Sequence, residues 1–329
     1  MFFIPKTYTL LFIISTSLAL FRRLCLASDT ISANQSLTIS ERLVSQNGEF
    51  ELGFFNPGYL NHWYVGIWYR NIPSWTIVWV ANRDDPVNGP NGMLRIADNK
   101  LVIYDSVNNE QVWSSNRSSN INMTNPVAKI LDTGNFVLKE AAAAESVYVW
   151  QSFDYPTDTL LPDMKLGWDS LTGIDRYLRS WKSADDPSSG KYEFKLNHSG
   201  FPEIFLWREN MRIFRTGPWI GTRVSGLAEM NPSTILNFEF VSKSDEIYYK
   251  LVLRHKSILP SRLVLSSGGL VERFTWVEES KTWSPFGYVM KDQCDVFRLC
   301  GTWGICDTDS SPVCKCLTGS VPKTRKLGI

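Results

Sequence analysis

Three aspartates in one short stretch are the first residues whose type and spacing could perform chemistry. Asp154, Asp158 and Asp163 lie within DYPTDTLLPD. Glycosidases use two carboxyl groups held close together, one as an acid and the other as a base or nucleophile. Aspartate beside threonine and proline is also ordinary turn chemistry, because its side chain accepts hydrogen bonds from nearby backbone N–H groups. The turn interpretation is the stronger one, and we expect no catalytic role for these residues.

Other catalytic groups are sparse. The chain has three histidines, His62, His198 and His255, and it lacks a GxSxG nucleophile motif and a phosphate-binding loop. A hydrolase acting on cell-wall sugars would need an acid pair, or a nucleophile beside a base. Kinase motifs are also missing, so we expect no catalysis by this chain and no cofactor. The net charge of +1 gives no reason to expect a nucleic-acid partner.

Cysteines gather at the end of the chain. Cys25 stands alone near the start, and five others lie in the last 36 residues: Cys294, Cys300, Cys306, Cys314 and Cys316. Their spacing lacks the two separated CxxC pairs of a zinc site. We therefore expect disulfides formed in an oxidising compartment and no metal.

The first residues predict export. Lys6 precedes an apolar run, Tyr8–Phe21, and small residues follow at Ala27. We interpret residues 1–27 as a cleaved signal peptide, because a membrane span needs about 20 apolar residues. Two arginines after the apolar run favour the alternative, a signal anchor that stays attached. Export would make four Asn-x-Ser/Thr sequons available for glycosylation: Asn34, Asn116, Asn122 and Asn197.

The elements that position these residues are expected to be β-strands. Short alternating runs dominate, such as EFELGFF, KLVIYD, NFVLKE and IYYKLVL, each bounded by turn residues. VWVAN, VWSSN and VWQSF recur with their tryptophans 34 and 37 residues apart. Such a period indicates one supersecondary unit used three times around a shared core.

The recurring tryptophans are expected to form that core. They are Trp79, Trp113 and Trp150, and burial of one such ring contributes on the order of 3 kcal/mol. Strict alternation would place Ile77 on the same face as Trp79. Trp68 and Trp75 lie outside the repeated position, so a core role and a binding role both stay open for them.

Several stretches are distinctive enough to carry a family resemblance: GIWYRNIPSWTIVWVANRDDPV, LDTGNFVL, WQSFDYPTDTLLPDMKLGWD, RTGPWIG and the terminal cysteines. The chain resembles the extracellular part of plant S-locus glycoproteins and S-domain receptor-like kinases. The resemblance implies an all-β fold with a bulb-type lectin β-prism of three four-stranded sheets at 28–153. It also implies a second, degenerate lectin-like S-locus glycoprotein domain at 154–285 and a truncated EGF-like module at 290–329.

Sugar binding in these lectins depends on a QxDxNxVxY strand, which this chain keeps only in part. In the second unit Asp98, Val102 and Tyr104 match, and in the third unit only Asn135 and Val137 match. A sugar pocket that loses polar groups leaves ligand hydroxyls unpaired, which weakens binding sharply. We therefore expect the fold to persist and mannose binding to be mostly lost, with strand packing as the alternative role of the matching residues.

The EGF-like likeness also implies a disulfide pairing. The family pairs the first cysteine with the third and the second with the fourth, which gives Cys294 with Cys306 and Cys300 with Cys314. Cys316 is then left unpaired. The chain would be a truncated gene product or a soluble short form.

The resemblance implies a secreted module that binds a cysteine-rich peptide or another extracellular cue, as in recognition of pollen. A mannose-type lectin and the ectodomain of a receptor-like serine/threonine kinase are the alternatives. Further implied partners are a full-length S-domain receptor kinase and a weakly bound glycan. The expected ligand surface lies near 201–215 and 267–279, with β-core as the alternative role, and uses Phe205, Trp207, Arg208, Met211, Arg212 and Phe214.

Overall fold

The computed structural model describes residues 28–115, 122–227, 236–254 and 260–321. These residues form antiparallel β-sheets, and their only helical elements are two 3-10 helices, η1 (Ser152–Asp154) and η3 (Gln293–Asp295). The expected all-β fold is confirmed. Within these ranges no helix is long and apolar enough to span a bilayer. The proposed signal peptide, 1–27, lies outside the described residues.

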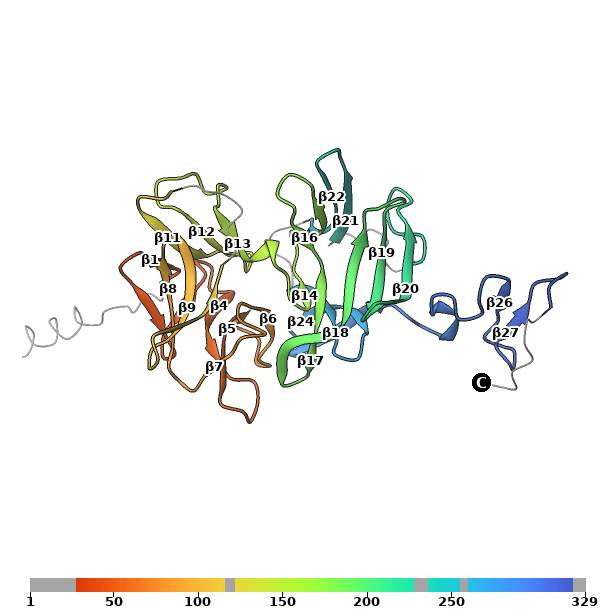
Figure 1. Cartoon of the computed structure of the whole chain (residues 1–329), viewed down its shortest axis with the longest axis horizontal. Helices are drawn as coiled ribbons and strands as arrows, with labels where there is room; N and C mark the ends of the chain where they lie inside the picture. Colours follow the sequence, from red (N-terminus) through yellow and green to blue (C-terminus); the bar gives the residue numbers. More distant parts are fainter. Residues whose placement is uncertain (1–27, 116–121, 228–235, 255–259, 322–329) are drawn as a thin grey trace, which may run out of the picture.

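Three sheets make up what we call the first block (Figure 1). Sheet one contains β3 (Arg42–Val44), β4 (Phe50–Phe55), β5 (His62–Tyr69) and β6 (Ile77–Val80), with β7 (Val87–Asn88) paired to β5. Sheet two contains β2 (Ser36–Thr38), β8 (Gly92–Ala97), β9 (Lys100–Asp105) and β10 (Glu110–Ser114). Sheet three contains β1 (Thr30–Ser32), β11 (Pro126–Ile130), β12 (Phe136–Glu140) and β13 (Trp150–Gln151).

The sequence repeat has a structural counterpart in these sheets. A buried serine follows two residues after the recurring tryptophan in sheets two and three. The Ser115 hydroxyl accepts a 3.0 Å hydrogen bond from the N–H of Leu101, and the Ser152 hydroxyl accepts one of 2.9 Å from the N–H of Phe136. The same side chain therefore satisfies the same buried backbone donor in both units.

The recurring tryptophans form one cluster, in which the ring of Trp150 contacts the other two. Trp79 and Trp150 are buried, and Trp113 is half-buried against the same core. The Trp150 ring centroid lies 6.0 Å from that of Trp79 and 6.2 Å from that of Trp113, both edge-to-face. This geometry is favourable for aromatic pairs, so the cluster ties the three sheets together.

The expected alternation along β6 is wrong. The pairing of β6 with β5 shifts register beside Trp68, so Ile77 does not share a face with Trp79. Ile77 and Val80 instead pack in a separate apolar cluster with Phe55 and Trp68. A β-bulge re-aims side chains in this way, and periodicity alone does not reveal it.

The second block also contains three sheets. Sheet four contains β14 (Thr159–Leu160), β23 (Ser261–Leu265), β24 (Val271–Val277) and β25 (Thr282–Tyr288). Sheet five contains β16 (Asp175–Arg176), β15 (Lys165–Asp169), β22 (Glu246–Leu253) and β21 (Leu236–Ser242). Sheet six contains β17 (Leu178–Ser183), β18 (Asp186–Asn197), β19 (Glu203–Arg208) and β20 (Met211–Pro218).

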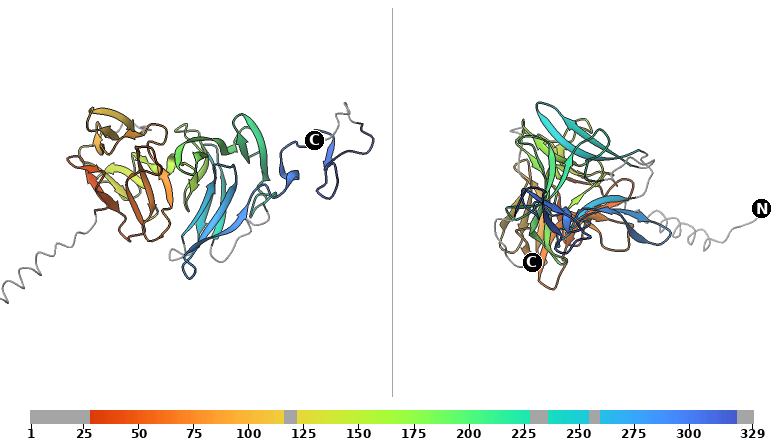
Figure 2. Two further views of the ribbon diagram at one scale, coloured as in Figure 1. Left: turned by 90° about the horizontal axis from the view of Figure 1, so that it is seen from below. Right: turned by 90° about the vertical axis from the view of Figure 1, so that its right-hand side faces the viewer.

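One arginine fastens the two blocks, which lie side by side in Figures 1 and 2. The Arg83 guanidinium, which follows β6, donates to the carbonyl oxygens of Ser180 at 2.6 Å, Pro187 at 2.8 Å and Arg179 at 3.0 Å. Next to it, the Asp84 carboxylate accepts hydrogen bonds of 2.7 Å from the backbone N–H and the hydroxyl of Ser189. The ANRDD stretch therefore attaches the first block to β17 and β18 by hydrogen bonds.

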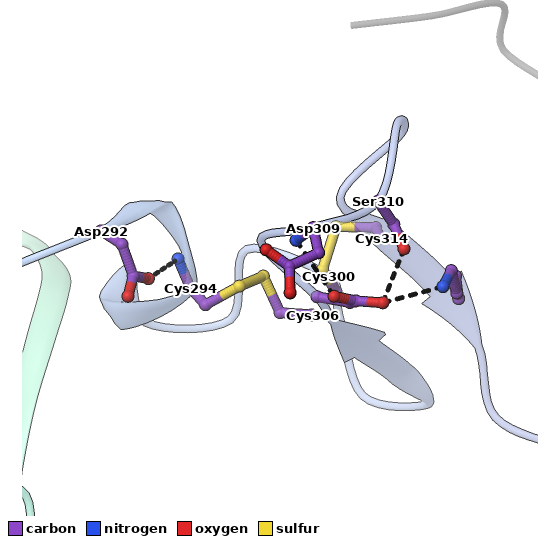
Figure 3. Close-up of a disulfide and its surroundings, with 9 residues drawn as sticks. Asp292, Cys294, Cys300, Cys306, Asp309, Ser310 and Cys314 are labelled. Carbon is purple, nitrogen blue, oxygen red and sulfur yellow. Dashed lines mark hydrogen bonds and ion pairs between the residues drawn. A yellow bond between two sulfur atoms is a disulfide. The ribbon is translucent and has the colours of Figure 1, made fainter.

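The tail extends beyond the second block as a small two-stranded sheet, β26 (Gly304–Cys306) and β27 (Cys314–Cys316) (Figure 1). Disulfides join Cys294 to Cys306 and Cys300 to Cys314, the pairing that the family resemblance implied (Figure 3). Cys316 is a free, exposed thiol.

Candidate ligand-binding surfaces

The strongest match to the sugar motif lies on the hairpin of β8 and β9. Asp98 and Asn99 form its turn with positive φ angles of 49° and 58°, a backbone conformation that Asp and Asn tolerate better than most residues. Asp98 is exposed and Val102 is buried. The half-buried Tyr104 ring is covered by the Arg95 guanidinium, whose carbon lies 4.2 Å from the ring centroid. The arginine therefore occupies the face of the tyrosine.

In the third unit the matching asparagine is used inside the protein. Asn135 is only 5% exposed. Its amide nitrogen donates to Gln151 at 2.9 Å, and its amide oxygen accepts hydrogen bonds of 3.2 Å from the Ser152 hydroxyl and the Phe153 N–H. Val137 is fully buried. Both ends of the asparagine amide thus hold the chain segment that leads into the second block.

The outer side of sheet one carries aromatic rings where the other units carry the sugar motif. Phe55, Tyr64 and Trp68 are buried there, and Trp181 of β17 packs against them. Trp75 is 57% exposed at the rim, with its centroid 5.8 Å from that of Trp68. This side is therefore largely an interface between the blocks. Of the two tryptophans whose role the sequence left open, Trp68 belongs to the core and Trp75 lies at the surface.

The three aspartates of the linker each have structural partners. Asp154 accepts a 2.7 Å hydrogen bond from Arg176 and one of 3.1 Å from Gln151. Asp158 accepts hydrogen bonds from the hydroxyls of the threonines on either side of it. Burial raises the pKa of its carboxyl, and the nearby Arg83 guanidinium opposes this rise. Asp163 is exposed, with a positive φ of 67°, and its carboxylate lies 3.9 Å from the Lys250 ammonium. The three aspartates therefore stabilise turns and contacts within the linker and with the second block.

Sheet six presents the candidate peptide surface on its outer side. The Arg212 guanidinium lies over two rings, 4.4 Å from the Phe205 centroid and 4.8 Å from the Trp207 centroid. Because Trp207 pairs with Arg212 and Phe205 pairs with Arg215 across β19 and β20, these four side chains share one side of the sheet. Neither Arg212 nor Arg215 has a carboxylate partner among the described residues.

The six residues of the predicted peptide surface separate into two groups. Phe214 is buried in the core. Phe205 is 6% exposed, because Arg212 lies over it and the tail residue Phe297 packs edge-on at 6.1 Å. Four remain at least partly accessible: Trp207, Arg208, Met211 and Arg212.

Phe297 of the tail also hydrogen-bonds a strand of this sheet. The backbone N–H of Phe297 donates to the carbonyl of Ile213 in β20 at 2.7 Å. Sequence reasoning missed Phe297, as it missed Arg95 on Tyr104. An aromatic residue between two cysteines was the only signal for Phe297, and the cross-strand pairing of Arg95 with Val102 cannot be read from the sequence.

The proposed sequons differ in their settings. Asn34 and Asn122 are exposed, and Asn197 is half-buried at the end of β18, with its amide donating to the Ser199 carbonyl. Asn116 lies outside the described residues. No group of three or more metal-ligating side chains occurs in the ranges that the structure describes.

The fold defines an all-β protein of the lectin β-prism class. The family profile described as D-mannose binding lectin matches residues 76–182, and the S-locus glycoprotein domain profile matches 214–324. The S-locus-specific glycoprotein S6 of Brassica oleracea is 41% identical over 97% of this chain and 73% of its own length. The chain belongs to the S-locus glycoprotein family.

Receptor kinases are also similar to this chain. The receptor-like serine/threonine-protein kinase SD1-8 of Arabidopsis thaliana is 48% identical over 94% of this chain, and the chain spans 37% of that protein's length. Among solved structures, a monomeric mannose-binding lectin from Gastrodia elata is 18% identical over 38% of this chain and 94% of its own, with a TM-score of 0.29.

Proposed function

We propose that this chain is an extracellular, non-catalytic recognition module that binds a cysteine-rich peptide or another secreted cue in cell-surface signalling, such as recognition of pollen. Family membership and the receptor kinases among the relatives support this proposal. The same likeness supports a location outside the cell or at its surface, and pairing with a full-length receptor kinase of the family.

The outer side of sheet six is the observation that carries the proposal. It combines a half-buried tryptophan, an exposed methionine and arginines without carboxylate partners among the described residues. Tryptophan and arginine are the residue types enriched at binding hot spots. Guanidinium groups already stacked on rings are preorganised, so they lose little conformational freedom when they bind an acidic side chain.

The proposal is tested by affinity capture of secreted peptides from the plant's own extracellular fluid, identified by mass spectrometry. A captured cysteine-rich peptide is then synthesised and titrated against the intact secreted protein. We expect Arg212→Ala to weaken binding by about tenfold or more, since charged hydrogen bonds in an interface contribute about 1.5–3 kcal/mol each.

Arg95→Ala is the matched control, because Arg95 also stacks on a ring but lies on the first block. It should leave peptide affinity unchanged. Equal loss in the two variants, or no loss in Arg212→Ala, would contradict placement of the ligand on sheet six.

Mannose binding is the second candidate, and it is favoured by the exposed Asp98 in the turn of the hairpin that carries Tyr104. If it holds, glycan-array binding should be displaced by free mannose and abolished by Asp98→Ala, while Asn135→Ala should act only through stability. Binding that survives Asp98→Ala would reject this hairpin as a sugar site.

A further inference from the structure

The second block contains a cavity that the proposed peptide surface does not use. Its volume is about 90 Å³, and all three sheets contribute to its lining. Sheet six contributes Phe194, Ile204 and Thr216, which lie on the opposite side of that sheet from Trp207 and Arg212. The cavity is therefore a separate site.

The lining is almost entirely apolar and reaches the surface at one end. Leu166 and Leu251 are buried at its interior, whereas Phe286 on β25 is 54% exposed. Protein interiors are normally packed without voids of this size, and an apolar cavity stays dry and accepts an apolar molecule. In the first block the corresponding inner sides are filled by fully buried rings, including Phe54 and Phe136.

One charged residue stands at this cavity without an ion-pair partner in the described part of the chain. Arg273 of β24 lines the cavity together with Val271 and Leu263, and its guanidinium carbon lies 3.9 Å from the Phe286 centroid. The other lining cation, Lys250, lies 3.4 Å from the Glu239 carboxylate. Burial lowers the pKa of Arg273 to about 10, so the group is still charged at neutral pH. A half-buried charge without a counter-ion is unfavourable unless a ligand supplies one.

From these features we infer that the second block binds a small aliphatic carboxylate, with its chain in the cavity and its carboxylate on Arg273. The apolar lining recognises the chain by burial of methylene groups, each contributing about 0.8 kcal/mol. The planar guanidinium recognises the carboxylate by paired hydrogen bonds, which a hydroxyl head group cannot accept in the same way.

The test uses the intact secreted protein and titration calorimetry with butanoate, whose short chain suits a cavity of about 90 Å³, at several temperatures. We expect saturable binding with a negative heat-capacity change, the sign of apolar burial. Butanol, which has a similar short chain without the charge, should bind more weakly. Arg273→Gln should reduce butanoate affinity by about tenfold or more while leaving butanol affinity unchanged.

Two further variants separate specific binding from general adsorption. Leu251→Phe fills the cavity and should abolish binding of both ligands; if it fails to fold, Val289→Leu provides a smaller filling change. Arg215→Gln, on the outer side of sheet six, should change neither affinity. The inference is overturned if butanoate gives no saturable heat, or if Arg273→Gln and Arg215→Gln affect its binding equally.

Discussion

At one position that matches the family's sugar motif, the side chain serves the fold. Both ends of the Asn135 amide form hydrogen bonds, with Gln151, Ser152 and Phe153. The Gln151 amide in turn donates a hydrogen bond to Asp154. Arg176 then joins Asp154 from the second block at 2.7 Å. A residue type suited to a sugar hydroxyl is thus part of a largely buried network, in which each unsatisfied group is costly.

Asn135→Ala tests this role. The change leaves the half-buried Gln151 oxygen, the buried Ser152 hydroxyl and the Phe153 N–H without their partner, so we expect the free energy of unfolding to fall by about 2–3 kcal/mol. Chemical denaturation measures the change. Asn71→Ala, which removes one exposed hydrogen bond to the Gly48 carbonyl, should stay within about 0.5 kcal/mol of the parent protein. Similar losses in the two variants would contradict the network.

How well the sequence predicts the role of a residue depends on whether its contacts follow from a pattern in the chain or from the pairing of strands. The buried Trp79 and Trp150 follow from a repeat visible in the chain, since a fixed spacing forces equivalent places in the fold. The Arg95 and Arg212 stacks join neighbouring strands, and their register was not deducible from residue types. Residue character alone also could not separate Phe214, which is core, from Trp207, which is half-buried at the surface.

Among the elements, the hairpins depend most on the residues of their own turns. The turn at Asp98 and Asn99 has the positive φ angles that such a pair accommodates, and the β-bulge beside Trp68 is where simple alternation fails. In the tail, the β26–β27 hairpin is held by disulfides and by one carboxylate. Asp307 accepts hydrogen bonds from Ser310 at 2.6 Å and Lys315 at 2.8 Å.

The Asp307 carboxyl gives a pH prediction for that hairpin. The Lys315 and Ser310 hydrogen bonds lower its pKa to about 2, below the value of about 4 for an unfolded chain. Its stabilising effect is therefore complete above about pH 4 and is lost as the pH falls toward 2. Carboxyl-detected NMR titration measures the midpoint. A midpoint near 4 for Asp307 would contradict the hydrogen bonds described here.

At the scale of the whole molecule, the two blocks are fastened by hydrogen bonds as well as by apolar packing. Arg83 crosses from the first block to four carbonyl groups of the second, and Trp79 donates a 2.8 Å hydrogen bond to the Tyr155 carbonyl in the linker. The Arg83 hydrogen bonds thereby hold sheet six against the first block.

Arg83→Met should loosen this arrangement. The variant keeps much of the aliphatic stem but leaves buried carbonyl oxygens unpaired, so we expect about 3 kcal/mol lower stability and faster protease cleavage between the blocks, near 154–163. Limited proteolysis followed by mass spectrometry measures the cleavage. Arg70→Met removes only a surface ion pair with Glu51 and should cleave like the parent protein. Unchanged cleavage in Arg83→Met would show that the Arg83 hydrogen bonds are not needed to hold the blocks together.

The most direct test of the account is hydrogen–deuterium exchange of the intact secreted protein with and without its bound peptide. If the sugar positions serve the fold and recognition lies on sheet six, binding should slow exchange in 203–218, while 93–105 on the first block stays unchanged. Protection confined to 93–105 would contradict the account, because it would place the ligand on the lectin hairpin.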